Sequence, residues 1–308
     1  MVLSPSDDQD DTYALYIKPN WPDIEYRQVA GPPYYGYKAH FKASEESAKF
    51  LTPSWMKENV TDRGPLGALY RVWGDGKQIV EGNKVDYFGL SGYTDEELEK
   101  MGYYVWMPVQ AKGAWLGETD NITLMNMLGN GFCGYEKGFY GGWGGRVLRN
   151  NSSSESNADE TATGNGIQND QGNLGVNEFP NFFPQAQRDF ANRLKWSVTE
   201  NYYDANHEPE VSIMGPLNLV ATPGQKIRLH GFVSDPDGDH AAVSWWQFHV
   251  GSYPGKVEIS NAISLQAGVL IPKDAVEGQT IHIIFEATDD GAPSLTRYQR
   301  VIVTVKDD

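Results

Sequence analysis

The chain has 308 residues, of which 40% are hydrophobic and 12% aromatic, enough for two domains with apolar cores. Its formal net charge of -16 excludes nucleic acid as an expected partner, because proteins that bind DNA or RNA need a surplus of lysine and arginine. The same charge disfavours an anionic membrane surface, and no apolar stretch approaches the roughly 20 residues of a membrane span.

The N-terminal region combines a cluster of carboxylates with a predicted mixed α/β layer. Residues 1–7 lack the basic and apolar regions of a signal peptide. Strands are predicted at 11–17 and 24–29. Acidic termini are usually solvated tails, but apolar residues follow Asp8, Asp10 and Asp11 at once. The alternative is an acidic loop at the end of a strand, where ligands bind in α/β folds.

Two helices are predicted within residues 1–205. The first spans 94–102, because Thr94 and Glu97 form a capping box and Gly102 is a typical C-terminal stop. The second spans 184–196 and has one apolar stripe. That stripe contains Phe183, Phe190 and Leu194, and the side expected to face water contains Gln185, Arg188, Asp189 and Lys195.

The tract 140–146 places four glycines around Trp143, which permits close approach of backbone segments. It lacks the lysine and spacing of a phosphate loop, so nucleotide phosphate is not an expected ligand.

Cys133 has no Cys or His nearby and is interpreted as a packed thiol. The polar segment 150–177 is predicted to be a mobile loop. N-glycosylation acceptor sequences, which indicate a secretory compartment but also arise by chance, occur at Asn59, Asn121, Asn150 and Asn151.

The last hundred residues predict an all-β domain. The helical pattern stops at a linker, 199–209, which places the domain boundary near 206 and divides the chain into 1–205 and 206–308. Strands are predicted at 210–214, 226–233 and 280–286. Short strands separated by Pro, Gly and Asp are typical of an immunoglobulin-like or cadherin-like sandwich.

Two acidic loops interrupt these strands, and in such a sandwich both lie at the same end. Calcium takes six to eight oxygen ligands, many of them from carboxylates, so a bound calcium ion is one interpretation. The other is that Asp, Pro and Gly are simply the residues that tight turns prefer. The candidate metal ligands are Asp235, Asp237, Asp239, Asp289 and Asp290.

Several tracts, taken together, resemble a family of secreted cellulose-binding proteins with a nucleoside-hydrolase-like domain. Those in the first domain are 8–11 (DQDD), 64–70 (GPLGALY), Glu118 with Asp120, 130–131 (NG) and 141–146 (GGWGGR). Those in the second are 215–224 (GPLNLVATPG), 234–239 (SDPDGD), 245–247 (WWQ), 253–255 (YPG) and 278–284 (GQTIHII).

The resemblance implies an α/β domain with Rossmann-type layers, followed by an immunoglobulin-like sandwich. In the family, the opening strand carries an Asp-rich motif that holds calcium and orients water against an N-glycosidic bond. This sequence begins at a tract that resembles the middle of that domain, so the first half of the sheet is expected to be missing, and 71–115 looks like an insertion. The candidate catalytic carboxylates are then Asp8, Asp10, Asp11, Glu118 and Asp120, with an ordinary helix cap as the alternative for Asp120.

The resemblance leaves three functions open. The first is a secreted protein that binds cellulose or another plant-wall polysaccharide, because sugar faces pack on aromatic rings. Its candidate anchors are Trp143, Trp245 and Trp246, although core packing is the alternative for each. Trp245 and Trp246 are adjacent on a strand and must point to opposite faces. The second is a hydrolase of N-glycosyl or other glycosyl bonds, expected to be inactive without the opening Asp motif. The third is a decayed gene fragment.

Overall fold

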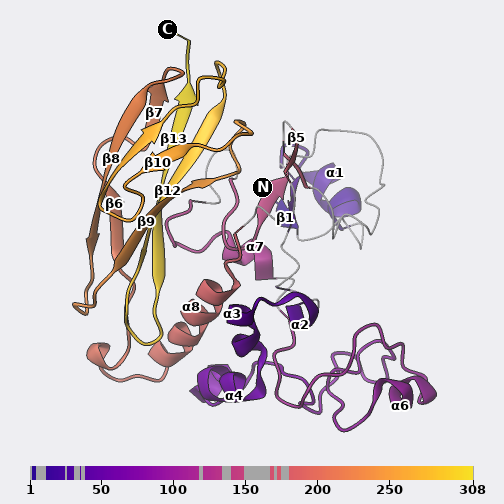
Figure 1. Cartoon of the computed structure of the whole chain (residues 1–308). Coiled ribbons are helices and arrows are strands. Elements are labelled where there is room, and N and C mark those ends of the chain that lie inside the picture. Colours follow the sequence, from indigo (N-terminus) through magenta and orange to yellow (C-terminus); the bar gives the residue numbers. More distant parts are fainter. Residues whose placement is uncertain are drawn as a thin grey trace. The chain divides into compact units, whose positions relative to one another are not determined.

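The structure is a computed structural model that describes residues 2–4, 12–24, 26–30, 35, 39–117, 121–133, 140–148, 167–169, 172–174 and 180–307. The chain forms two compact units (Figure 1). Unit 1 comprises Met1–Pro32, Asp120–Asn181 and Asn206–Asp308, and unit 2 comprises Pro33–Thr119 and Phe182–Ala205. Among the described residues, no helix is long and apolar enough to cross a membrane.

Eight strands after residue 206 form two four-stranded sheets in unit 1. One sheet has the order β10-β11-β8-β6, and the other has the order β7-β13-β12-β9. All their pairings are antiparallel except that of β7 with β13. The strands are β6 (Glu210–Ile213), β7 (Asn218–Ala221), β8 (Lys226–Ser234), β9 (Ala242–Phe248), β10 (Glu258–Ser260), β11 (Gln266–Leu270), β12 (Thr280–Thr288) and β13 (Thr296–Val305). The strands predicted at 210–214, 226–233 and 280–286 are thereby confirmed.

The two sheets share one hydrophobic core, which holds them together. Leu229 and Val269 enter it from one sheet, and Ile283, Phe285 and Val301 enter it from the other. Trp245 stacks on the Phe285 ring with the ring centroids 4.4 Å apart. Burial of each such side chain contributes about 1.5–3 kcal/mol to folding, so this core is the main source of stability in the region.

The opposite face of the β7-β13-β12-β9 sheet is covered by residues 130–133 and 140–145 of the same unit. Phe132 stacks on Tyr298 with centroids 3.9 Å apart. The backbone N–H of Tyr298 donates to the carbonyl of Asn130 at 2.9 Å, and the Arg300 guanidinium donates to the carbonyl of Gly141 at 3.0 Å. This sheet is therefore packed on both faces, which explains the near-continuous burial of β12 and β13.

Unit 1 also holds the remaining short strands. β1 (Val2–Ser4) pairs in parallel with β2 (Tyr26–Ala30), which pairs antiparallel with β3 (Arg146–Leu148). The strand predicted at 24–29 is thus confirmed. Within the predicted mobile loop 150–177, the structure describes only the hairpin β4 (Ile167–Asn169) and β5 (Gly172–Leu174). A short helix, α7 (Ile122–Met125), precedes the glycine-rich tract.

The strand predicted at 11–17 is wrong. Tyr13–Ile17 forms a π-helical turn, η1, followed by α1 (Lys18–Asn20). A short apolar run does not distinguish strand from helix by its pattern. Ala14 and Leu15 favour helix, and the exposure of Leu15 and Tyr16 leaves no sheet packing to override that preference.

The regular elements that the structure describes in unit 2 are helices. The longest, α8 (Phe183–Trp196), confirms the helix predicted at 184–196. Asp189 was expected to face water but is buried and forms an ion pair with Arg193 at 2.6 Å. The shorter helical segments are α2 (Ala39–Lys42), α3 (Glu45–Ala48), η3 (Lys49–Leu51), α4 (Pro53–Met56), η4 (Lys57–Thr61), α5 (Gly64–Gly67) and η8 (Tyr202–Asp204).

Residues 72–115 form a lobe of unit 2 with its own small core. An antiparallel bridge between Val72 and Trp115 closes the lobe. Its only regular helix among the described residues is α6 (Asp95–Lys100), which confirms the helix predicted at 94–102, with both hydrogen bonds of the capping box present. The core consists of Trp73, Tyr87, Leu98, Met107 and Ala114.

Candidate functional site

The two acidic loops of unit 1 meet at one end of the paired sheets. The first, 234–239, follows β8, and the second, 288–293, follows β12. The backbone N–H of His240 donates to Oδ1 of Asp290 at 2.8 Å, which joins the two loops directly.

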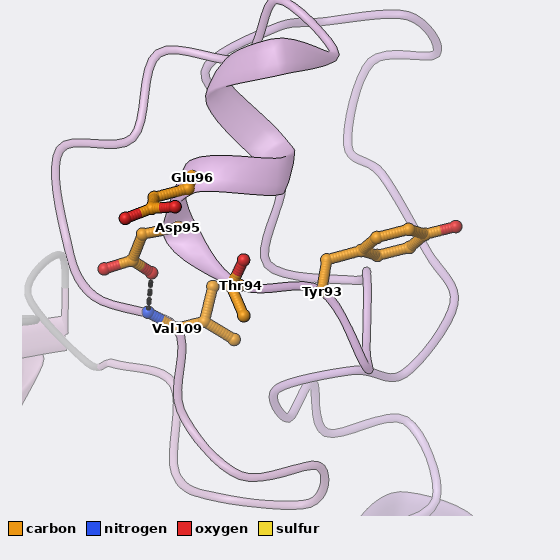
Figure 2. Close-up of a pocket in the computed structure, with 5 residues that line it drawn as sticks. All are labelled: Tyr93, Thr94, Asp95, Glu96 and Val109. Atoms are coloured by element: carbon orange, nitrogen blue, oxygen red, sulfur yellow. Dashed lines mark hydrogen bonds between the residues drawn. The ribbon is translucent and has the colours of Figure 1, made fainter.

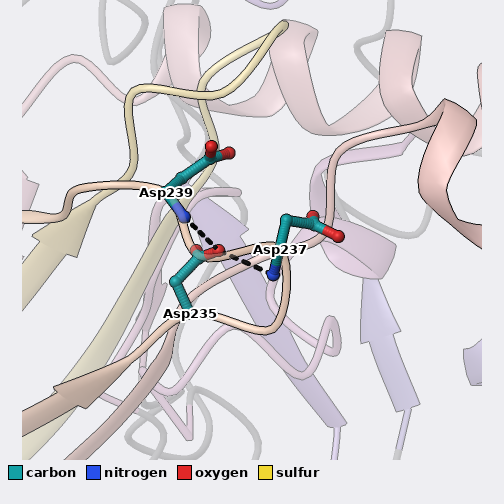
Figure 3. Close-up of side chains that lie close together, drawn as sticks. All are labelled: Asp235, Asp237 and Asp239. Atoms are coloured by element: carbon teal, nitrogen blue, oxygen red, sulfur yellow. Dashed lines mark hydrogen bonds between the residues drawn. The ribbon is translucent and has the colours of Figure 1, made fainter.

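Within the first loop, three carboxylates lie close enough to bind one ion. One oxygen of each of Asp235, Asp237 and Asp239 lies within 4.8 Å of the others. Figure 3 shows the Asp235 carboxylate at the centre of the loop, where Oδ1 accepts from the backbone N–H of Asp237 at 2.9 Å and of Asp239 at 3.1 Å. Its Oδ2 is buried and has no hydrogen-bond partner among the described residues.

Electrostatic repulsion in this loop is visible at Asp239. Burial of the carboxyl, together with the negative charges of Asp235, Asp290 and Asp237, raises the pKa of Asp239. Ionising a group whose pKa is raised by like charges costs free energy, and a divalent cation would offset that cost. An oxygen-only donor set with a buried acceptor that lacks a partner therefore fits a hard cation such as calcium.

Asp289 has a different role from the one predicted. It is only 3% exposed, and its Oδ1 accepts from the backbone N–H groups of Gly291 at 3.1 Å and Leu295 at 2.9 Å. The Asn206 amide donates to both of its oxygens at 3.1 Å. Burial raises the pKa of Asp289, whereas these hydrogen bonds lower it. Asp289 thus ties the second loop to residue 206.

Sequence reasoning missed two residues at this end of the sheets. Asn206 holds Asp289, and the adjacent His207 donates its backbone N–H to Asp237 Oδ2 at 2.6 Å while its ring Nδ1 lies 3.1 Å from the same carboxylate. The signal in the sequence is the polar pair Asn206-His207, a few residues before strand β6. The role of His207 is visible only in the folded protein, where it contacts Asp237, 30 residues away in the sequence.

Burial removes two of the three predicted carbohydrate anchors. Trp143 is 1% exposed and Trp245 is 3% exposed, so neither ring presents a face to a polysaccharide. Trp245 belongs to the core between the sheets, and Trp143 packs edge-on against Tyr298. Trp246 is partly buried, donates its indole N–H to Glu286 at 2.9 Å and packs against Phe248.

The catalytic carboxylates predicted from the resemblance, Asp8, Asp10, Asp11, Glu118 and Asp120, lie outside the described residues. A buried polar pair that the sequence did not indicate lies under Tyr140 and Gly141. Nδ1 of His282 accepts from the Arg300 guanidinium at 3.2 Å, because a guanidinium can only donate. Burial, and next the charge of Arg300, lower the pKa of His282 to about 3, so its imidazole is neutral at physiological pH.

Exposed aromatic side chains and a pocket occur together in the 72–115 lobe. Tyr104 is 68% exposed and Trp106 is 37% exposed. A pocket of about 590 Å³ surrounds the start of α6 and is lined by Tyr93, Thr94, Asp95, Glu96 and Val109 (Figure 2). Oδ1 of Asp95 accepts from the backbone N–H of Val109 at 2.9 Å, which fixes one wall. The sequence contained these aromatics, but their exposure depends on the packing of the lobe.

Two family models match the chain. Residues 2–147 match the model described as "Cellulose-binding Sde182, nucleoside hydrolase-like domain", and residues 226–305 match "Cellulose-binding protein Sde0182, C-terminal domain". The two models describe the two parts of one kind of protein, and together they span well over half of the chain. No curated protein matches the sequence.

Among solved structures, the chain is similar to a nucleoside hydrolase-related hypothetical protein from Saccharophagus degradans that is associated with carbohydrate metabolism. The identity is 22% and the TM-score is 0.59, and the match covers 96% of this chain but 60% of that one. At this identity the likeness shows the fold alone. Murine CRIg also matches, at 13% identity, over 33% of this chain and 100% of its own length, with a TM-score of 0.24, which is too low to carry an argument.

Proposed function

Because the chain belongs to the family of cellulose-binding proteins with a nucleoside-hydrolase-like domain, we propose that it is a secreted protein that binds cellulose or a related plant-wall polysaccharide. The observation that carries this proposal is the joint match of both family domains. The exposed aromatic rings of the described residues support it, since the C–H faces of sugars pack on such rings. The net charge of -16 is compatible with a neutral polysaccharide and unfavourable for a polyanion.

The direct test is sedimentation of the protein with insoluble cellulose. The protein is expected in the pellet, and soluble cello-oligosaccharide added in excess is expected to return it to the supernatant. An unrelated acidic protein of similar size controls for trapping between fibres. Binding that is equal for both proteins, or a protein that stays in the supernatant throughout, contradicts the proposal.

A second candidate function is hydrolysis of an N-glycosyl or other glycosyl bond. It is supported by the match of residues 2–147 to a nucleoside-hydrolase-like domain. The residues proposed for this chemistry are the carboxylates Asp8, Asp10, Asp11, Glu118 and Asp120. Release of free base from nucleosides in the presence of calcium, lost in Asp120→Ala, would support this function, and no release would count against it.

We further propose that the acidic loops hold calcium as a structural ion. The proposed ligands are Asp235, Asp237 and Asp239, with Asp290 close by and Asp289 contributing through the shape of its loop. The carboxylate oxygens within 4.8 Å of one another and the buried Oδ2 of Asp235 support this assignment. The ion would brace the end of the two sheets and would supply no catalytic step.

We also propose that the C-terminal region from about residue 206 is an immunoglobulin-like or cadherin-like sandwich. The two mainly antiparallel sheets around one core are the arrangement expected of an immunoglobulin-like or cadherin-like domain that begins near residue 206. Limited proteolysis of the whole protein tests the boundary, because a cut between 197 and 205 is expected before any cut within 210–305. Early cleavage inside the sheets would contradict it.

A further inference from the structure

We infer that Tyr104 and Trp106, together with the neighbouring pocket at the start of α6, form the surface that holds a neutral glucan chain. This inference rests on the proposed polysaccharide binding and assigns it to a place in the molecule. The site lies entirely in the 72–115 lobe and does not involve any of the tryptophans predicted from the sequence.

Burial alternates along residues 103–107. Tyr103, Val105 and Met107 pack into or against the core of the lobe, and Met107 is 1% exposed. Tyr104 and Trp106 lie between them and are both exposed. In an extended segment, residues two apart point to the same side with a spacing of about 7 Å. Two aromatic side chains, two residues apart, are therefore both exposed to solvent.

The Trp106 ring and the backbone of Tyr104 are held in place despite the exposure of both side chains. The indole N–H of Trp106 donates to the carbonyl of Val85 at 3.1 Å, and its ring packs edge-on against Phe88 with centroids 5.2 Å apart. The backbone N–H of Tyr104 donates to the carbonyl of Lys84 at 2.9 Å. A ring that is already fixed loses little entropy when a ligand packs on it, which favours binding.

The pocket supplies hydrogen-bonding groups in the same lobe as the aromatic pair. Val109, which lines it, is three residues from Trp106, no more than about 10 Å of extended chain. Tyr93 adds another exposed ring, and Glu96 adds an exposed carboxylate. Carboxylates accept hydrogen bonds from sugar hydroxyl groups, so aromatic faces and acidic acceptors together suit a polyhydroxylated ligand.

The charge of α6 selects among polysaccharides. Asp95, Glu96, Glu97 and Glu99 all lie in this six-residue helix, with Lys100 as its one basic residue. A chain that carries carboxylate groups would be repelled here, whereas an uncharged glucan would not. The charge therefore favours an uncharged polysaccharide such as cellulose as the ligand of this surface and disfavours polygalacturonate.

The test is an adsorption isotherm of the full chain on insoluble cellulose, for wild type, Tyr104→Ala, Trp106→Ala and the double variant. Tyr203→Ala, at an 88% exposed position of the same unit, and Phe232→Ala, on the outer face of the other unit's sheet, are the controls. The double variant is expected to bind about tenfold or more weakly, and both controls like wild type. Neither wild type nor any of the variants is expected to bind polygalacturonate.

The outcomes separate the site from the function. If wild type does not bind cellulose, the proposed function fails and the site fails with it. If wild type binds and the double variant binds equally well, the site is wrong while the function stands. Trp106→Ala also removes a contact to Phe88, so a melting curve accompanies each variant. Tyr104→Ala removes no described side-chain hydrogen bond, and unchanged binding of this stable variant alone would count against the site.

Discussion

The indole N–H of Trp143 donates to the phenolic oxygen of Tyr298 at 3.2 Å, between residues 155 positions apart. Both side chains are buried. The contact lies where the glycine-rich tract 140–145 covers the outer face of the β7-β13-β12-β9 sheet. The glycines and the tryptophan that suggested a binding loop in the sequence thus form an internal packing surface of unit 1.

Replacing Trp143 is therefore expected to reduce stability. Trp143→Ala should lower the free energy of unfolding by about 3–5 kcal/mol, because it leaves a cavity and removes one hydrogen-bond partner of Tyr298. Trp143→Phe should cost less, since most of the apolar contact remains. Urea denaturation followed by circular dichroism measures both. A Trp143→Ala protein as stable as wild type would refute this packing role.

The glycine at 144 is expected to be irreplaceable. A Cβ atom there would overlap the carbonyl oxygen of Ile122, which is backbone and cannot move aside cheaply. Gly144→Ala should cost about 1–3 kcal/mol or more. Gly129→Ala is the matched control in the same region, because a Cβ at Gly129 meets nothing within 4 Å, and it should change stability by less than about 0.5 kcal/mol. Equal effects of the two changes would argue against the close approach.

Calcium is expected to raise the melting temperature of the protein through the acidic loop. A carboxyl whose pKa is higher in the folded state destabilises that state when it is ionised, so Asp239→Asn should not lower the melting temperature without calcium. The same change should abolish the increase that calcium produces. Glu277→Gln, at an exposed position, is the control and should leave the increase intact. A melting temperature that does not respond to calcium in wild type would exclude the site.

The buried histidine predicts acid sensitivity. The pKa of His282 is lowered to about 3 in the folded protein from an ordinary value of 6.5, so below pH 6.5 the unfolded chain binds a proton that the folded chain does not. The free energy of unfolding should therefore decrease as the pH is lowered from 6.5 to 3. This group contributes up to about 1.4 kcal/mol per pH unit to that decrease. His282→Gln removes the titrating group and should reduce the difference in stability between pH 7.5 and pH 5.

The control for this prediction is His240→Gln, because the side chain of His240 is exposed. It should leave the dependence of stability on pH unchanged. If the free energy of unfolding of His282→Gln depends on pH as strongly as that of wild type, other groups account for the acid sensitivity.

The sequence predicted the elements whose pattern is local. The strands around 226–234 and 280–288 alternate or run as continuous apolar stretches, and the capping box of α6 is readable from Thr94 and Glu97 alone. The burial of Trp143 depends on Tyr298, far along the chain, and no local pattern contains it. Likewise, 103–107 consists of five apolar or aromatic residues, so its alternation is invisible until the core of the lobe is known.

The acidic loops show the same limit. Sequence reasoning identified the five aspartates and their two loops, but it could not separate Asp235, whose Oδ2 lacks a partner, from Asp289, whose carboxylate is occupied by Asn206 and backbone N–H groups. That difference arises from residue 206, whose place beside the second loop is set by the fold.

The most direct test of the account compares two tryptophans in two measurements, adsorption to cellulose and melting temperature. Trp106→Ala combined with Tyr104→Ala should lose adsorption by about tenfold or more while the fold is retained. Trp143→Phe should keep the adsorption of wild type while its melting temperature falls. Adsorption that depends on Trp143 in a fully stable protein, and not on Tyr104 and Trp106, would contradict the assignment of both.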